Sequence, residues 1–369
     1  MIAHVDVIEA NREDWTRDPV KLIEEEGYFY GRGTIDMKAQ AAVLVDNMMR
    51  FREHGYHPKR SIKLALTCGE ESDTTAVDGA EWLTKHDMPA ISAELALTEG
   101  IDGSLDAAGH RVALNILAAE KTYEDYTFEV TSPGGHSSRP VPDNAIYPLV
   151  RAVDRVSLYA FPVQRGDANW GYFARMAHLV AAEDSAAMLA VVRNPQNAAA
   201  VAVLDKNPKW HAMLRTTCVA TMLSAGHAQN VLPQRAGANI NCRIFPGVAL
   251  EEVLEQLRKV ANDPVLTVKM SEHSGPVAPP APLTPRVLGP IEKVAATMWP
   301  GIPVVPTLEP GASDGQYLNT AGIPTYGVSG FFTDPDNGHV HGLNERVRVK
   351  SVYEGRSFLY QLVKLYAEQ

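Results

Sequence analysis

The strongest constraint on the fold is a change in the hydrophobic pattern of the chain near residue 118. Before this point, short alternating apolar runs typical of strands take turns with longer runs at helical spacing. A chain that alternates strands and helices usually forms a mostly parallel sheet with helices on its faces. We expect strands at 2–6, 61–67 and 93–98, and helices at 37–54 and 79–86.

Beyond residue 118 the elements follow the order of a smaller α+β unit. The order is β-α-β-β-α-β, which is typical of ferredoxin-like folds. A helical insert at about 161–216 interrupts this unit, and the proline-rich run Pro276–Pro285 is expected to be a linker. We expect strands at 124–131, 219–224, 237–245 and 265–270, and helices at 144–159 and 250–261.

Strand patterns return after the linker, at 303–306 and 324–329. The simplest architecture is therefore one α/β domain that is split in sequence, with a smaller α+β domain inserted into it. We predict that residues 1–117 and 278–369 form the first domain. Residues 118–277 are predicted to form the inserted domain.

Composition limits the classes of partner and of covalent cross-link. The 369-residue chain has a formal net charge of −10, whereas nucleic-acid binders normally carry a basic patch. No apolar run approaches the roughly 18 residues of a membrane span. We therefore expect neither a nucleic-acid nor a membrane partner. Cys68, Cys218 and Cys242 are too few and too scattered for a disulfide framework or a cysteine zinc site, and we expect them to be reduced thiols.

The start of the chain resembles the last part of a buried strand with nothing before it. We therefore expect the natural chain to be longer than the 369 residues given. The compartment cannot be read from this terminus. The cytoplasm is the default expectation, and a periplasmic or secreted protein stays open.

Histidines and carboxylates recur just after the expected strands of the first domain. In open α/β sheets, residues at the carboxyl ends of strands converge on one cleft even when they are distant in sequence. Each one alone would usually be an ordinary polar group, but together they are ligands that zinc accepts. Two ions that share a carboxylate can hold one bridging water, lower its pKa and polarise a substrate carbonyl. The set is His4, Asp6, Asp36, Glu70, Glu71, Glu99 and His341.

The ordered motifs that carry these residues resemble those of a known family. Together they resemble the di-zinc aminoacylase/carboxypeptidase metallopeptidase family, most of all its carboxypeptidase S and aminoacylase branch. Acetylornithine deacetylase and succinyl-diaminopimelate desuccinylase are further members. The resemblance covers essentially the whole chain. The motifs are His4-Val-Asp-Val7, Gly31-Arg-Gly-x-x-Asp-Met-Lys38, Gly69-Glu-Glu71, Thr98-Glu-Gly100 and His341-Gly-x-x-Glu-Arg346.

The resemblance implies a metal ligand at five positions. His4 and Glu99 would bind one zinc ion, and Glu71 and His341 would bind the other. Asp36 would bridge both ions. The cofactor expected is therefore two Zn²⁺ ions per subunit, with Co²⁺ or Mn²⁺ as possible substitutes.

The resemblance also implies the residues that support and use the metal pair. Asp6 would lie behind His4, accept its other ring proton and fix the imidazole. Glu70 would be the general base, which takes a proton from the bridging water and returns it to the leaving amine. The peptide bond between Asp36 and Met37 is expected to be cis.

The loop Ser132–Pro140 resembles the glycine-histidine loop of the family's lid domain. Its histidine, His136 here, would reach into the active site of the partner subunit and support the developing oxyanion. The enzyme would then be a homodimer joined through the lid. The alternative is an ordinary turn histidine in a glycine-rich loop.

Asn230 and Arg243 resemble the family's site for the substrate carboxylate. The planar guanidinium of an arginine suits a carboxylate because it can donate two parallel hydrogen bonds. The alternative for Arg243 is a salt bridge at a sheet edge, and for Asn230 a turn cap before a proline.

The insert is rich in large apolar side chains whose role the sequence leaves open. They would either line an apolar acyl pocket, or form the core of the insert or a dimer face, and we favour the latter two. These residues are Trp170, Tyr172, Phe173, Met176 and Trp210.

These patterns predict a zinc-dependent hydrolase that cleaves the amide bond of N-acyl or peptidyl amino acids with a free carboxylate. A dipeptidase or aminopeptidase on the same scaffold is the enzymatic alternative; an aminopeptidase would recognise a free amine and would have no use for Arg243 or the lid histidine. A non-catalytic metal-binding relative is the other alternative. It predicts loss of ligands or of the base, yet all of these residue types are present.

Overall fold

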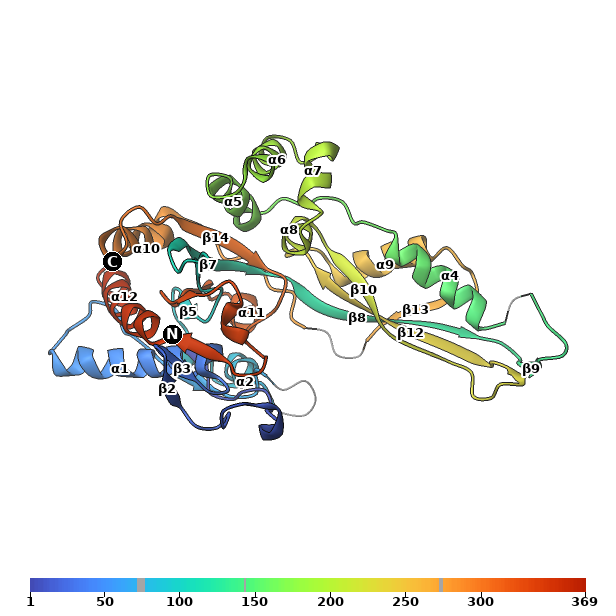
Figure 1. Ribbon diagram of the computed structural model, residues 1–369, viewed down its shortest axis with the longest axis horizontal. Coiled ribbons are helices and arrows are strands. Elements are labelled where there is room, and N and C mark those ends of the chain that lie inside the picture. Colours follow the sequence, from blue (N-terminus) through green and yellow to red (C-terminus); the bar gives the residue numbers. More distant parts are fainter. Residues whose placement is uncertain (72–76, 143, 272–274) are drawn as a thin grey trace.

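The molecule is elongated, with a sheet-and-helix domain at one end and a long, narrow domain extending from it (Figure 1). The computed structural model describes residues 1–71, 77–142, 144–271 and 275–369. The strand β7 (Arg111–Glu120) belongs to the first domain, and β8 (Thr122–Thr131) continues from it after one residue into the second. The α/β class with an inserted α+β unit is confirmed.

The first domain is built on a mixed sheet with the strand order β16-β6-β7-β15-β5, and β14 pairs with β7. The pairs β14–β7, β15–β5 and β16–β6 are parallel, whereas β6–β7 and β15–β7 are antiparallel. A separate parallel pair joins β1 and β4. The bounds are β1 (Ile2–His4), β4 (Ala65–Thr67), β5 (Ala96–Thr98), β6 (Gly103–Leu105), β14 (Val304–Glu309), β15 (Thr325–Gly327) and β16 (Phe332–Thr333).

Helices cover this sheet, and a small antiparallel sheet lies beside it. Helices α1 and α12 pack on each other, and α10 packs on α12. Phe358 and Leu359 of α12 are fully buried, as is Ile291 of α10. The helices are α1 (Ala39–Glu53), α2 (Gly79–His86), α3 (Met88–Ile91), α10 (Pro285–Met298), α11 (Gly315–Thr320) and α12 (Val349–Ala367); the small sheet contains β2 (Ile23–Glu25), β3 (Tyr28–Tyr30) and β17 (Arg346–Arg348), and short turns of helix lie at Arg12–Asp14, Thr34–Lys38 and Asn337–His339.

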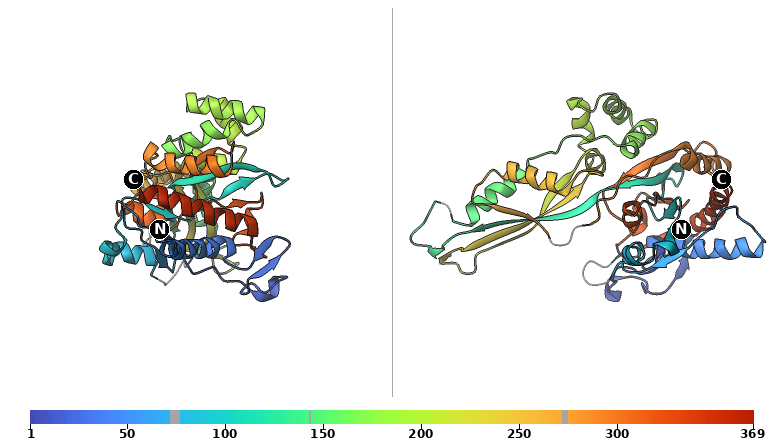
Figure 2. Two further views of the ribbon diagram at one scale, coloured as in Figure 1. Left: turned by 90° about the vertical axis from the view of Figure 1, so that its left-hand side faces the viewer. Right: turned by 180° about the vertical axis from the view of Figure 1, so that it is seen from behind.

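The second domain has the ferredoxin-like arrangement that its element order predicts. Its antiparallel sheet has the order β10-β12-β8-β13, and two helices cover one face (Figure 2). Tyr126 and Phe128 of β8 and Ile240 of β12 are fully buried in this core. The further bounds are α4 (Ile146–Ser157), β10 (Thr217–Ala225), β12 (Arg235–Ile244), α9 (Leu250–Ala261) and β13 (Thr267–Met270), and a short pair, β9 (Gly135–His136) with β11 (Val231–Leu232), lies at the far tip.

The helical insert packs on the first domain rather than on the sheet of the second. Helix α5 contacts β14, and the Cα of Gly171 lies so close to Pro306 that a Cβ there would be 2.6 Å from the proline ring. Trp170 and Phe173 are buried in the core shared with the first sheet. This packing favours a core role for the apolar side chains of the insert. The insert contains α5 (Asp167–Met176), α6 (Ala182–Arg193), α7 (Ala198–Leu204) and α8 (Pro208–Leu214).

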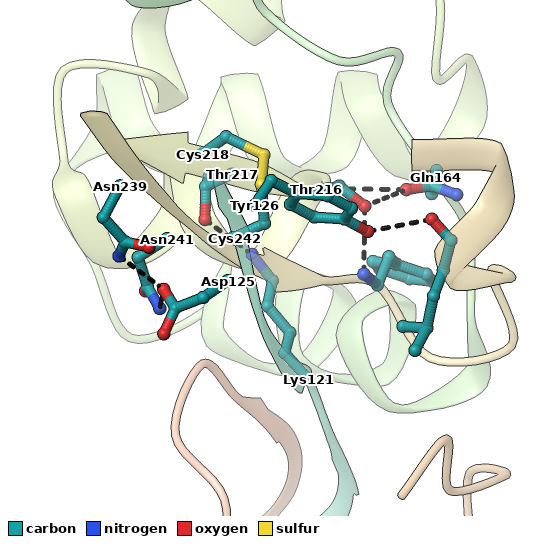
Figure 3. The surroundings of a disulfide bond; sticks show 12 residues. Lys121, Asp125, Tyr126, Gln164, Thr216, Thr217, Cys218, Asn239, Asn241 and Cys242 are labelled. Carbon is teal, nitrogen blue, oxygen red and sulfur yellow. Dashed lines mark hydrogen bonds between the residues drawn. A yellow bond between two sulfur atoms is a disulfide. The ribbon is translucent and has the colours of Figure 1, made fainter. Parts of the chain in front are cut away.

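The expectation of three reduced cysteines is wrong. Cys218 of β10 and Cys242 of β12 form a disulfide (Figure 3). Cys68 is free and exposed. The two bonded cysteines lie directly opposite each other on adjacent antiparallel strands, with their Cα atoms 4.1 Å apart. Their spacing in sequence could not show this, because the pairing depends on the register of the two strands. Within the described residues, no helix is long and apolar enough to span a bilayer.

Candidate metal centre

Strand ends bring the predicted ligands together. His4 ends β1, Glu70 and Glu71 follow β4, and Glu99 follows β5. Because β1 and β4 are parallel and in register from Ile2 to His4, the residues after them emerge at the same edge. The side chain of His4 is fully buried, so its ring is held by its strand and by its polar neighbours.

Asp36 lies between two histidines. Its Oδ1 atom is 3.2 Å from Nε2 of His4, and its Oδ2 atom is 2.8 Å from Nε2 of His341. On the first side, Oε2 of Glu99 is 3.3 Å from the same His4 nitrogen. On the second side, Oε2 of Glu71 is 3.2 Å from the His341 nitrogen. The five side chains therefore form two histidine-carboxylate pairs that share one carboxylate, in the pairing that the resemblance implies.

The peptide bond between Asp36 and Met37 is cis, as expected. Two groups of side chains each place their ligand atoms within 4.8 Å of one another. One group is His4, Asp36 and Glu71, and the other is His4, Glu70 and Glu99. Imidazole nitrogens and carboxylate oxygens are ligands of zinc and of similar divalent ions. The residues present therefore fit divalent cations; both groups contain His4, and neither contains His341.

The electrostatics of the cluster also favour cations. Burial alone would lower the pKa of His4, but hydrogen bonds to Asp36 and Glu99 outweigh it and raise this pKa to about 12. Hydrogen bonds to Asp36 and Glu71 raise the pKa of His341 to about 10. Burial, and then the charge of Glu99, raises the pKa of Glu70 to about 9. Crowded carboxylates thus hold positive charge on both histidines, and bound cations would relieve the same repulsion.

Asp6 connects the two halves of the cluster from behind. Its Oδ1 atom is 3.5 Å from Nδ1 of His4, whose ring also lies 3.2 Å from the Asp6 carbonyl oxygen. Its Oδ2 atom accepts a hydrogen bond from the backbone N–H of Glu71 at 3.1 Å. Asp6 therefore fixes the ring of one predicted ligand and the backbone of another.

Two buried residues of the site had no role in the sequence analysis. Arg32 Nη1 donates to Oε2 of Glu345 at 2.6 Å, and both side chains are almost completely buried. Both residues stand inside the quoted motifs, Gly31-Arg-Gly and His341-Gly-x-x-Glu. A charged residue at a fixed place in each of two ligand-bearing motifs was the signal that could have identified them.

The cluster opens into a cavity of about 860 Å³. Asp36, Glu70, Glu71, Glu99 and His341 line one part of it. Glu309 at the end of β14 and Lys209 of α8 line another part, so the insert contributes to the wall. A chamber of this size is enough for a small amide or a short peptide.

His136 and Asn230 lie far from this cavity in the same chain. Both are exposed at the tip of the second domain, where the backbone N–H of Ser137 donates to the Asn230 carbonyl at 3.1 Å (Figure 1). Arg243 lies at the other end of β12, opposite Tyr123 of β8. The structure thus brings His136 and Asn230 together, and separates Asn230 from Arg243 within one subunit.

Comparison with known proteins agrees with this geometry. The mouse N-fatty-acyl-amino acid synthase/hydrolase PM20D1 is 28% identical over 375 residues, which cover 99% of this chain and 73% of that protein. Human aminoacylase-1 is 25% identical over 95% of this chain and 76% of its own length. The crystal structure of an M20 family metallo-carboxypeptidase from Sulfolobus solfataricus matches 99% of this chain and 84% of its own, with a TM-score of 0.68 and 16% identity.

A family model for peptidases matches the chain over residues 1–365, which is almost its full length. The match includes every predicted metal ligand, the second domain and the insert. The family is metal-dependent, which suits the paired histidine-carboxylate cluster around Asp36. The chain belongs to peptidase family M20/M25/M40.

Proposed function

We propose that this hydrolase cleaves the amide bond of N-acyl or peptidyl amino acids whose carboxylate is free, and that it uses two zinc ions. The observation that carries the proposal is the position of Asp36 between two histidine-carboxylate pairs, with Glu70 at the same cavity. The similar PM20D1 and aminoacylase-1 sequences support N-acyl amino acids as the substrate class.

His4, Glu99, Glu71 and His341 would hold the ions, with Asp36 shared between them. When bound, the ions would lower the pKa of a water molecule and polarise the scissile carbonyl. They would also lower the pKa of Glu70 from the raised value that the uncompensated carboxylates produce.

Glu70 would act as the general base. Its carboxylate takes a proton from the attacking water as the C–O bond forms, and later gives that proton to the leaving nitrogen as the C–N bond breaks. Its position beside Glu71 at the cavity wall supports this role, because a substrate amide in the cavity would lie next to this carboxylate.

His136 would donate a hydrogen bond to the developing oxyanion in the neighbouring subunit. Its Nδ1 atom accepts the backbone N–H of Ser138 at 3.2 Å, so in the neutral ring the proton is on Nε2. The exposed Nε2–H is then a donor of fixed orientation at the tip of the lid.

A second copy of this chain would bring that tip to the cavity. Strand β10 is an edge of its sheet, and Val219, Met222 and Leu223 on it are exposed. An exposed apolar edge strand suits pairing with an identical strand around a two-fold axis. Such a dimer would place His136 and Asn230 of one subunit near the metal centre and Arg243 of the other.

Arg243 would bind the substrate carboxylate. Its guanidinium stacks on the Tyr123 ring at 4.7 Å, and among the described residues it makes no hydrogen bond or ion pair. Burial lowers the pKa of Arg243, as expected of a cation that lacks a bound anion. A carboxylate ligand would supply the missing hydrogen bonds.

The test compares N-acetyl-methionine with its carboxamide, using wild type, Arg243→Ala and Arg243→Lys. A charge-assisted contact of about 1.5–3 kcal/mol predicts a 10- to 150-fold lower kcat/KM for the acid in the alanine variant, with poor rescue by lysine. Wild type should already cleave the carboxamide poorly, and the alanine variant should lose little more. Equal damage to both substrates would show that Arg243 is structural and would remove the case for carboxylate recognition.

A further inference from the structure

We infer that the buried Arg32–Glu345 pair is a positioning device that aims Asp36 and His341 at the second metal ion. The inference rests on the metal centre proposed above. The two residues are 313 positions apart in sequence, and each belongs to a loop that carries a predicted ligand.

Glu345 holds the loop of Asp36. One carboxylate oxygen, Oε1, accepts the backbone N–H of Ile35 at 2.9 Å and that of Asp36 at 3.4 Å. The other oxygen, Oε2, accepts Nη1 of Arg32 at 2.6 Å. The Glu345 carbonyl oxygen also accepts the N–H of Gly31 at 3.1 Å. One fully buried residue thus fixes both ends of the turn that presents the shared carboxylate.

Arg32 holds the loop of His341. Its Nη2 atom donates to the carbonyl oxygens of Gly342 at 3.0 Å and His341 at 3.3 Å. The guanidinium also lies over the Trp15 ring, 5.2 Å from its centroid. These contacts use the fork of the guanidinium, which a lysine could not reproduce.

His341 needs such support more than the other histidine does. It has a φ of +60°, a left-handed conformation that residues other than glycine rarely adopt. Its side chain is half exposed, so packing does not fix the ring. His4, in contrast, lies in a paired strand, is buried and has Asp6 behind it. The loop ligand therefore depends on Arg32, whereas the strand ligand does not.

The experiment measures zinc affinity of the metal-free full chain by competition with a fluorescent chelator. Wild type should bind two ions with two measurable constants. Arg32→Met should weaken one constant by about 10- to 100-fold, as loss of a partner behind a ligand typically does. The other constant should change much less, because only the shared Asp36 connects that ion to the Arg32–Glu345 pair. Arg32→Lys should recover only part of the loss, and Glu345→Gln should weaken the same ion because Arg32 loses its charged partner.

Arg111→Met is the matched control. Arg111 also pairs with a glutamate, Glu354, and lies over a tryptophan ring, Trp299, but its side chain has no polar contact with a ligand loop among the described residues. Its two zinc constants should equal those of wild type. Thermal unfolding of each metal-free variant separates a local effect from a global one, and Glu345→Gln, which keeps its shape, decides the question if Arg32→Met does not fold.

Two different results would overturn the inference, and only the second would also overturn the proposed metal centre. If folded Arg32→Met and Glu345→Gln bind both ions as tightly as wild type, the pair does not position the ligands, and the proposed function is untouched. If wild type itself binds no zinc, the proposed metal centre fails together with the inference.

Discussion

Lys121 is a buried cation at the junction of the two domains. It is 1% exposed, and its Nζ donates to the Thr217 hydroxyl at 3.2 Å, close to the disulfide (Figure 3). Burial, then the charges of Arg243 and Arg215, lowers the pKa of Lys121 to about 7. The folded protein therefore releases this proton far more readily than the unfolded chain, whose lysine has a pKa of 10.5.

This pKa predicts a pH-dependent gain in stability for Lys121→Met. Between about pH 7 and 10, Lys121 is protonated in the unfolded chain but has lost its proton in the folded protein. The free-energy cost of burying Lys121 therefore becomes smaller as pH rises. Below about pH 7 the penalty is complete. The rise in melting temperature of Lys121→Met over wild type should therefore be larger at pH 6.5 than at pH 9.5. An equal difference in melting temperature at pH 6.5 and pH 9.5 would show that burial does not lower the pKa of Lys121.

The boundaries of helices were predicted from the sequence more accurately than those of strands. Helices α2 and α9 begin and end at the residues that their spacing and caps predict, whereas the strand expected at 61–67 is paired only over Ala65–Thr67. A helix is stabilised by contacts within its own segment, but a strand exists only where a partner lies beside it. The packing of α5 on β14 was not foreseen for the same reason, since it joins segments remote in sequence.

The disulfide between β10 and β12 should contribute to the stability of the second domain. It closes a loop with a sequence separation of 24 residues. Loop-closure entropy predicts that Cys218→Ala with Cys242→Ala lowers the free energy of unfolding by about 3 kcal/mol. Urea unfolding of oxidised protein measures this loss, and Cys68→Ala is the control because Cys68 is free. If the double variant unfolds at the urea concentration of the control, the two thiols are not bonded.

The site was more predictable than the pairings around it. The proximity of Asp36, Glu71 and His341 could be predicted because each stands in an ordered motif whose residue types match metal ligands. The Arg32–Glu345 pair and the disulfide could not, because both depend on which distant segments meet in space. The sequence gives the chemical type of each residue directly. It does not show which distant residues come into contact, because contacts depend on the folded structure.

The ligand cluster lies in the first domain, far from His136 at the tip of the second domain. This separation predicts that each active site combines residues from two subunits of a dimer. In the proposed mechanism, Glu70→Gln lacks the general base, and His136→Ala lacks the hydrogen-bond donor at the tip of the second domain. A mixed dimer has one centre that is served by both wild-type residues, so mixing the two inactive variants should restore part of the activity. Subunit exchange must be shown separately, for example with differently tagged chains. No recovery after proven exchange would place His136 in the site of its own chain.

The most direct measurement for the proposed function is the turnover of N-acetyl-methionine by Glu70→Gln, with the metal content determined on the same sample. Glutamine keeps the size of Glu70 but cannot take a proton from water. We predict two bound zinc ions and a kcat reduced by roughly 100- to 10,000-fold, the usual contribution of a general base. Two bound ions with a kcat within tenfold of wild type would show that Glu70 is not the general base.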